Sequence, residues 1–145
     1  MSILVAIDLS DSTDKVIKVA EKMATVMQSS LYLLHVAEPD PDFVGYDVGP
    51  ETVRDQMAAK FHQQHVEIQK HSKKLRENKI DCTAILAQGP TVDTVLKQAN
   101  KLSVEYIIIG SHGHGAVYDI LVGSISAGII KKSAVPVTIV PVIND

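Results

Sequence analysis

The sequence lacks several features that would assign it to a specialised class of protein. Cys82 is the single cysteine among 145 residues, so no disulfide can form within the chain, which fits a reducing compartment. The formal net charge is only −3 and the basic residues are scattered, which gives no electrostatic indication of nucleic-acid binding. The first apolar run ends at Asp8 and follows no basic segment, so it is too short for a signal peptide or a membrane span. These absences predict a cytoplasmic protein without nucleic-acid or membrane partners.

What the chain does contain is enough apolar residues for one core. Hydrophobic residues make up 46% of the sequence, a share typical of globular proteins rather than disordered ones. No repeat, low-complexity tract or linker interrupts the chain. A single domain over residues 1–145 is therefore expected.

Aliphatic runs and helical spacings alternate along the sequence. The runs predict strands at residues 3–7, 31–36, 80–86, 106–109 and 135–142. The spacings predict helices from the cap-forming residues 8–12 to 27, and over about 51–77, 90–102 and 124–133. Strands that alternate with helices indicate an α/β fold with a parallel sheet covered on both faces. Such sheets bind ligands beyond the carboxyl ends of their strands, at a topological switch point.

A glycine-rich turn follows the predicted strand at 106–109. Gly113 and Gly115 can adopt positive φ at no steric cost, so that successive N–H groups converge on an anion. Ser124 can cap the helix that follows, and the helix dipole adds about half a positive charge at its start. A loop of this kind that returns to a helix N-terminus favours a phosphate cradle. The alternative is a plain turn followed by a plain helix cap.

Two better-known phosphate motifs are excluded at this position. The residues from Gly110 to Gly115 do not have the G-x-G-x-x-G spacing, and no acidic residue follows at the distance needed to hold a ribose. The spacing from Gly123 to Gly128 is that of a P-loop, but Ile129 stands where a lysine is required. The chain is therefore expected to be neither a dinucleotide-binding protein nor a Walker-type ATPase.

Several segments along the chain resemble the universal stress protein family. The opening VAIDLS, the Leu34-His35-Val36 segment, Gly89-Pro90 and the ending VPVTIV match the family pattern. The most specific match is the family's nucleotide motif, G-x2-G-x9-G-[ST], which is carried here by Gly110, Gly113, Gly123 and Ser124. Val104-Glu105 departs from the usual Ala-Asp, outside the motif. The resemblance covers essentially the whole chain and is to the ATP-binding branch.

The resemblance implies a specific fold and a ligand site. The fold is a three-layer αβα sandwich of the adenine nucleotide alpha hydrolase-like type, with a five-stranded parallel sheet in the order 3-2-1-4-5. The ligand is ATP or another adenine nucleotide, held between the first and fourth strands. The residues expected to contact it are Ala6, Ile7, Asp8, Val36, Gly110, Ser111, His112, Gly113, His114, Gly115, Ala116, Gly123, Ser124, Ile125 and Ser126.

Four of these residues have alternative roles. By resemblance, Asp8 contacts the ribose or the metal–phosphate region, but it can equally cap the first helix. By resemblance, the main chain of Val36 pairs with adenine, but Val36 is also typical of strand core. His112 and His114 invite a metal site, yet no third ligand stands nearby in the sequence, so bordering the phosphates is the simpler interpretation. His35, within an apolar strand, is expected to be a core histidine with a hydrogen-bond partner.

The composition of the loop bears on the cofactor and on catalysis. No lysine or arginine lies between Gly110 and Ser126, so a Mg²⁺ or Mn²⁺ ion is expected to bridge the phosphates. Neither a base nor an arginine finger is evident, so hydrolysis should be slow or absent. The first hypothesis is an ATP-binding regulatory, stress-response protein. The alternatives are a slow ATPase or phosphotransferase assisted by Asp8 or His114, and a nucleotide-free dimeric assembly protein.

Two further segments point to partners. The strand from Val135 to Val142 is apolar and carries two prolines, which suit an edge, and an open apolar edge is a liability. The family pairs this edge across a two-fold axis, so a homodimer is expected. The long acidic loop at residues 37–50 is expected to serve as a lid or a partner surface.

Overall fold

The computed structural model describes residues 1–37, 50–111 and 123–142. Its strands are β1 (Ser2–Ala6), β2 (Ser30–Ala37), β3 (Cys82–Gln88), β4 (Tyr106–Gly110) and β5 (Val137–Val140). Its helices are α1 (Thr13–Met27), α2 (Pro50–Glu77), α3 (Thr91–Lys101) and α4 (Ser124–Lys132). Within these ranges, no helix combines the length and the apolar character needed to cross a bilayer.

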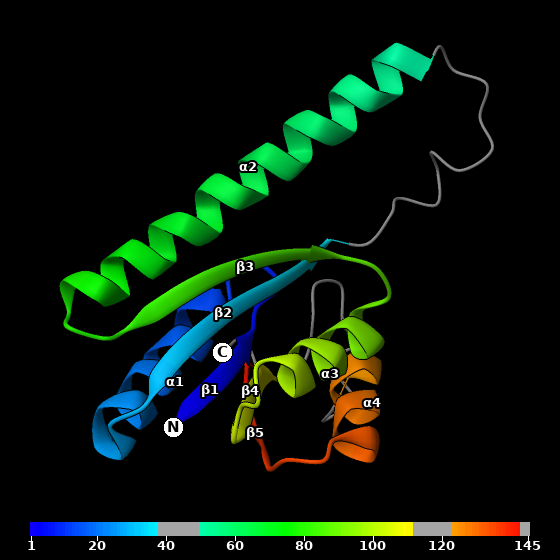
Figure 1. The fold of residues 1–145 in the computed structure, drawn as a ribbon. Coiled ribbons are helices and arrows are strands. Elements are labelled where there is room, and N and C mark those ends of the chain that lie inside the picture. The colour runs from blue at the N-terminus through cyan, green and yellow to red at the C-terminus, as the bar shows by residue number, and fades with distance from the viewer. Residues whose placement is uncertain (38–49, 112–122, 143–145) are drawn as a thin grey trace.

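The strands form one parallel sheet in the order β3-β2-β1-β4-β5 (Figure 1). The predicted α/β class and strand order are confirmed. Helices α1 and α2 pack on one face, and α3 and α4 on the other. Because side chains alternate along a strand, Ile3 and Val5 of β1 enter the first core while Leu4 enters the second. This double burial explains why the strands are almost continuously apolar.

Strand β5 is shorter than the predicted run of residues 135–142. Pro136 and Pro141 flank it, and a proline has no N–H to donate to a ladder. The carbonyl oxygen of Pro136 still accepts the Ile107 N–H at 3.0 Å. The prolines therefore shorten the strand without detaching its start from β4.

Helix α2 is longer than the sheet that it covers. Its 28 residues span about 42 Å at the rise of an α-helix, whereas the seven residues of β3 span about 23 Å. Figure 1 shows the helix running past the end of the sheet. Ile68 and Leu75 are fully buried, whereas Met57, nearer the start of the helix, is 41% exposed. Among the described side chains, the buried ones of α2 therefore lie in its second half.

A polar contact holds the second half of α2 on β3. The Ser72 hydroxyl, which is completely buried, donates to the Cys82 carbonyl oxygen at 3.2 Å. The Arg76 guanidinium donates to the Ser72 hydroxyl at 2.6 Å and to the same carbonyl at 3.1 Å. Each buried polar atom of this contact thus has a partner, as a buried hydroxyl requires.

Candidate functional site

The candidate site lies at the carboxyl edge of the sheet, between β1 and β4. These strands are neighbours, with Ala6 opposite Ile109. The chain leaves β1 for α1 on one face and leaves β4 for α4 on the other. Neighbouring strands whose connections diverge in this way form a topological switch point, where an open parallel sheet leaves a crevice. The structure therefore has a switch point between β1 and β4, as the strand order implied.

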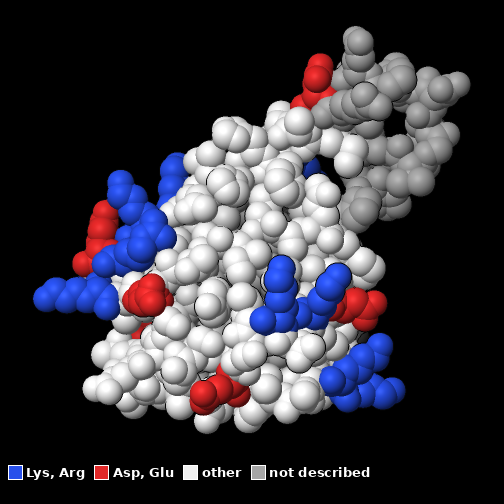
Figure 2. Space-filling view, viewed as in Figure 1, with Lys and Arg blue, Asp and Glu red and all other residues white. Residues whose placement is uncertain are grey.

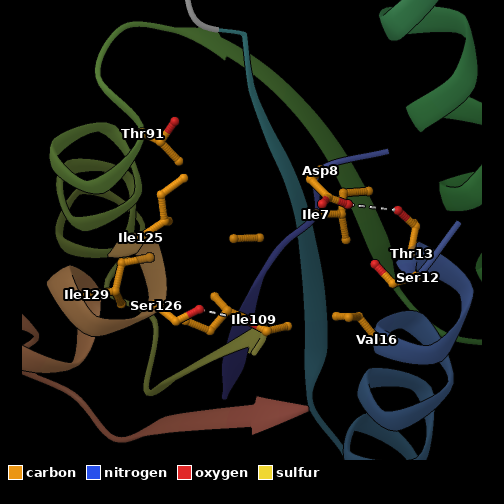
Figure 3. A pocket seen from close by; sticks show the side chains of 12 residues that line it. Ile7, Asp8, Ser12, Thr13, Val16, Thr91, Ile109, Ile125, Ser126 and Ile129 are labelled. Atoms are coloured by element: carbon orange, nitrogen blue, oxygen red, sulfur yellow. Dashed lines mark hydrogen bonds between the residues drawn. The ribbon is translucent and has the colours of Figure 1, made fainter. Parts of the chain in front are cut away.

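A pocket occupies this switch point (Figure 3). The predicted ligand residues that line it are Ala6, Ile7, Asp8, Gly110, Ile125 and Ser126. Lining residues that the sequence did not reveal are Ser12, Thr13, Val16, Thr91, Ile109 and Ile129. Thr91 could have been found, because Gly89-Pro90 already marked the start of a helix there.

Asp8 lies on the side of the pocket where α1 begins (Figure 3). Its Oδ1 accepts the Ser10 N–H at 3.1 Å, the Ser10 hydroxyl at 2.6 Å and the Thr13 hydroxyl at 3.5 Å. Leu9 takes a left-handed φ of 59° to make this turn. No described residue bonds to Oδ2. One carboxylate oxygen thus holds the turn, and the other has no partner among the described residues.

The alternative role of Asp8 as the cap of α1 is only indirectly realised. The N-cap position of α1 is Ser12, and no side chain there bonds to the helix. Asp8 instead accepts hydrogen bonds from Ser10, in the turn that precedes the helix, and from the Thr13 hydroxyl. Its contribution to α1 is therefore the shape of the approach rather than a capping bond.

The opposite side of the pocket is formed by the start of α4. Gly123 is the N-cap, with φ −69° and ψ 168°, and its carbonyl oxygen accepts the Ala127 N–H at 2.9 Å. The expectation that Ser124 caps this helix is wrong: Ser124 is its first residue, and it makes no side-chain capping bond. Among the described residues, no acceptor faces the N–H groups of Ser124, Ile125 and Ser126. These three donors and the helix dipole give the wall a positive potential.

Two buried hydroxyls tie together the ends of the segment that joins β4 to α4. Ser126 donates its hydroxyl proton to the Gly110 carbonyl oxygen at 2.7 Å, and it also lies 3.4 Å from the Ser111 carbonyl oxygen. The Gly123 N–H donates to the Ser111 carbonyl oxygen at 2.7 Å. The Ser111 hydroxyl accepts the Val142 N–H at 3.1 Å. The start of α4 is thereby held against the ends of β4 and β5.

These bonds show that Ser111 and Ser126, both predicted ligand residues, stabilise the fold around the pocket. Ser111 and Ser126 are each only 4% exposed. The hydroxyl proton of Ser126 is engaged inside the protein, so its main-chain N–H is the group left for a ligand. The sequence did not reveal this use, because the partners are main-chain groups distant along the chain: the Gly110 carbonyl oxygen for Ser126 and the Val142 N–H for Ser111.

The pocket is predominantly apolar in its described part. Asp8 is the only ionisable side chain among the described lining residues. Ile125 is 41% exposed at the pocket, a high value for an isoleucine. On the face drawn in Figure 2, Lys and Arg side chains are interspersed with Asp and Glu side chains. An anion in the pocket would meet helix N–H groups rather than cationic side chains from these walls.

Several predicted residues cannot be placed at the pocket. His112, Gly113, His114, Gly115 and Ala116 lie outside the described residues, as does most of the acidic loop. In the part of the chain that is described, no three His, Cys, Asp or Glu side chains gather to form a metal site.

Val36 lies near the end of β2 and pairs with Ala87 of β3. Its side chain, 9% exposed, belongs to the core under α3 and α4. The strand-core interpretation of this side chain is confirmed. His35, 8% exposed, bonds through Nδ1 to the Ile7 carbonyl oxygen at 2.9 Å, as expected of a core histidine.

Comparison with known proteins agrees with this architecture. The model of the universal stress protein family matches residues 1–141 of this chain. The chain belongs to the universal stress protein family. The universal stress protein YxiE of Bacillus subtilis is 29% identical over 142 residues, which are 94% of this chain and 96% of YxiE.

Solved structures of universal stress proteins share the fold. The structure of MJ0577, from Methanocaldococcus jannaschii, superposes with a TM-score of 0.83 at 26% identity and covers 99% of this chain and 97% of its own. A universal stress protein in complex with cAMP has a TM-score of 0.70 at 17% identity, covering 99% and 98%. One from Archaeoglobus fulgidus in complex with dAMP has a TM-score of 0.64 at 18% identity, covering 97% and 97%. At such identities the last two show a shared fold.

Proposed function

We propose that this universal stress protein binds an adenine nucleotide, ATP or a close relative, in the pocket between β1 and β4. The observation that carries the proposal is that the Asp8 carboxylate and the N-terminus of α4 face each other across one crevice. The available Oδ2 of Asp8 suits a ribose hydroxyl or a metal ion. The N–H groups of Ser124, Ile125 and Ser126 suit phosphate oxygens.

Structural relatives support an adenine ligand. Universal stress proteins of the same fold have been solved with cAMP and with dAMP. The spacing of Gly110, Gly113, Gly123 and Ser124 in this chain is that of the family's nucleotide motif. The described ends of this motif, Gly110 and Gly123, meet through Ser111 and Ser126 beside the pocket.

A divalent cation, Mg²⁺ or Mn²⁺, is part of the proposal. A nucleoside triphosphate carries several negative charges, and the described walls offer helix N–H groups without a lysine or arginine. A cation of this kind binds through phosphates and one or two carboxylates. Asp8 is the carboxylate in reach of the crevice, directly or through water.

We propose a regulatory binding role rather than catalysis. Phosphoryl transfer needs a positioned nucleophile and charge stabilisation beyond helix N–H groups. Asp8 is the only ionisable group that the described walls contribute. Occupancy by the nucleotide would then be the signal that a partner protein detects.

A homodimer through β5 is proposed as well. Strand β5 lies at the edge of the sheet and pairs with β4 alone among the described strands. Its residues Val137, Thr138 and Ile139 are only partly buried. A second copy pairing along this edge would cover it.

Calorimetry with and without Mg²⁺ tests the nucleotide site. Wild-type protein should bind ATP in the presence of Mg²⁺, and Asp8→Asn should weaken binding by about tenfold, because a charge-assisted contact becomes a neutral one. Asp11→Asn is the matched control, since Asp11 is exposed in the same turn and lies outside the pocket.

The outcomes separate the alternatives. Equal affinities of Asp8→Asn and wild type would remove Asp8 from the site, and no heat with ATP, ADP, AMP or cAMP would favour a nucleotide-free assembly protein. Turnover of radiolabelled ATP that disappears in Asp8→Asn, but persists in Asp11→Asn, would favour an enzyme. Mass spectrometry of ligand released from freshly purified protein would identify the physiological nucleotide.

A further inference from the structure

The ladder between β1 and β2 ends with a side chain in place of a main-chain bond. The Ile7 N–H donates to the Leu34 carbonyl oxygen at 2.9 Å. In a parallel ladder the next bond would join the Val36 N–H to the Ile7 carbonyl oxygen. The structure has no such bond; the Nδ1 of His35 lies 2.9 Å from that carbonyl oxygen. Since a carbonyl oxygen only accepts, Nδ1 carries the proton and His35 takes the position of the missing rung.

Because the His35 side chain takes the place of this main-chain bond, the N–H and the carbonyl oxygen of Val36 both remain without a partner from β1. Successive residues of a strand direct their main-chain groups to opposite neighbours. The Ala37 carbonyl oxygen accepts from Gly89, beyond β3, and the Leu34 carbonyl oxygen accepts from Ile7. Val36 therefore faces the β1 side, where β1 has already ended. Among the described residues, nothing bonds to its N–H or its carbonyl oxygen there.

We propose that His35 is a positioning residue, which holds the Ile7 carbonyl so that the N–H and C=O of Val36 stay open to a base. This inference rests on the proposed nucleotide site. An adjacent donor and acceptor on the main chain complement a base edge that presents an acceptor and a donor, as the amino group and ring nitrogen of adenine do. A main-chain pair at a strand end is rigid, so it can discriminate between bases.

The histidine also fixes the residue that precedes Asp8. With the Ile7 N–H bonded to Leu34 and the Ile7 carbonyl bonded to His35, both polar groups of Ile7 are held by β2. The turn that presents Asp8 therefore begins from an immobilised peptide. The His35 imidazole thus positions both ends of the proposed site: Val36, which would bind the base, and the turn with Asp8, which would bind the sugar or a metal ion.

Substitutions at residue 35 separate this role from simple packing. His35→Leu removes the donor at similar bulk, so the Ile7 carbonyl becomes free to accept the Val36 N–H and extend the ladder. His35→Asn keeps an N–H near the position of Nδ1. His35→Gln places its N–H farther out, and it replaces the leucine variant if that protein does not fold. His62→Leu, on an exposed residue of α2, is the matched control.

The first measurement needs no nucleotide. Amide hydrogen exchange at Val36, followed by NMR, should slow by about tenfold in His35→Leu, because a hydrogen bond forms where none existed. His35→Asn and His62→Leu should exchange like wild type. Unchanged exchange at Val36 in folded His35→Leu and His35→Gln would overturn the inference.

The second measurement is the preference for ATP over inosine triphosphate, whose base lacks the amino group. Wild type should prefer ATP by about tenfold, the value of one hydrogen bond. The preference should approach one in His35→Leu and be retained in His35→Asn. A preference that survives in folded His35→Leu would also overturn the inference. If wild type binds neither nucleotide, the proposed function fails, and exchange at Val36 still decides whether His35 holds the ladder open.

Discussion

At the scale of single residues, the site depends on a few polar groups, each with a defined partner. The Asp8 carboxylate divides its oxygens between the turn and the pocket. The Ser126 hydroxyl is used against the Gly110 carbonyl oxygen, and the His35 imidazole is used against the Ile7 carbonyl oxygen. A buried acceptor that loses its donor costs more than the hydrogen bond gains on average. Such residues are therefore expected to be sensitive even where they do not touch the ligand.

Replacing Ser126 tests this sensitivity. Ser126→Ala should lower the free energy of unfolding by about 1–2 kcal/mol, because the Gly110 carbonyl loses its donor within a buried site. Ser124→Ala, on an exposed residue of the same turn, should change it by less than about 0.5 kcal/mol. Chemical denaturation of both variants measures the difference. Equal stabilities would show that the 2.7 Å contact contributes nothing to the fold.

Cys82 gives the chain a pH dependence at the alkaline end. Burial raises the pKa of its thiol above the ordinary value of 9.0, against smaller lowering effects of Ser72 and Arg76. The folded protein then keeps a proton that the unfolded chain has lost, so this contribution is complete below about pH 9 and declines as the pH rises toward the folded pKa. The free energy of unfolding should fall more steeply above about pH 9 in wild type than in Cys82→Ala. Parallel curves would contradict this, and comparing the two proteins cancels the titration of other groups.

At the scale of elements, the helices that border the pocket are fixed at their N-terminal ends. Helix α4 is held to β4 and β5 through Ser111 and Ser126. Helix α3 follows Gly89, whose φ of 138° is a conformation that side chains disfavour. Helix α2 is held only over its second half, through Ser72 and the apolar residues around it. The pocket is thus built from firmly attached helix starts, whereas the described first half of α2 stands apart from the sheet.

Paired substitutions along α2 test this difference in attachment. Ile68→Ala should lower the free energy of unfolding by about 2–4 kcal/mol, because Ile68 is fully buried and its removal leaves a cavity. Met57→Ala, in the first half of the same helix and 41% exposed, should change it by less than about 0.5 kcal/mol. Thermal or chemical denaturation compares the two variants. A large loss in Met57→Ala would mean that the first half of α2 packs against something in solution, such as a second copy.

At the scale of the whole molecule, the sheet has one switch point and two edges. The switch point between β1 and β4 hosts the proposed nucleotide site. The β5 edge hosts the proposed dimer contact, and Ser111 bonds to β5 residues as well as to the segment leading into α4. Ser111 therefore links the segment that leads into α4, beside the pocket, with the β5 edge.

Hydrogen exchange along β5 tests the dimer without a mutation. The Ile107 N–H bonds to the Pro136 carbonyl oxygen and the Ser111 N–H to that of Val140, so even-numbered residues of β5 face β4. Val137 and Ile139 direct their N–H groups to the open edge. Their exchange should slow as protein concentration rises, while that of Thr138 and Val140 stays constant. Concentration-independent exchange at all four, with a monomer mass in sedimentation, would rule out this interface.

Local patterns in the sequence were sufficient for the element order and the parallel α/β class. Strand and helix periodicity depend on residues two to four positions apart, and the glycine motif lies within one stretch of chain. Family resemblance supplied the strand order, which the structure confirms.

Long-range contacts decided the rest. Because β3 is shorter than α2, the first half of α2 extends beyond the sheet, although apolar residues such as Met57 occur there. The uses of His35, Ser126 and Ser111 depend on partners 28, 16 and 31 positions away, which meet only once the sheet and helices have packed. A side chain's hydrogen-bond partner is set by what packing brings within about 3 Å, so no local pattern could have revealed that an imidazole ends the ladder before Val36.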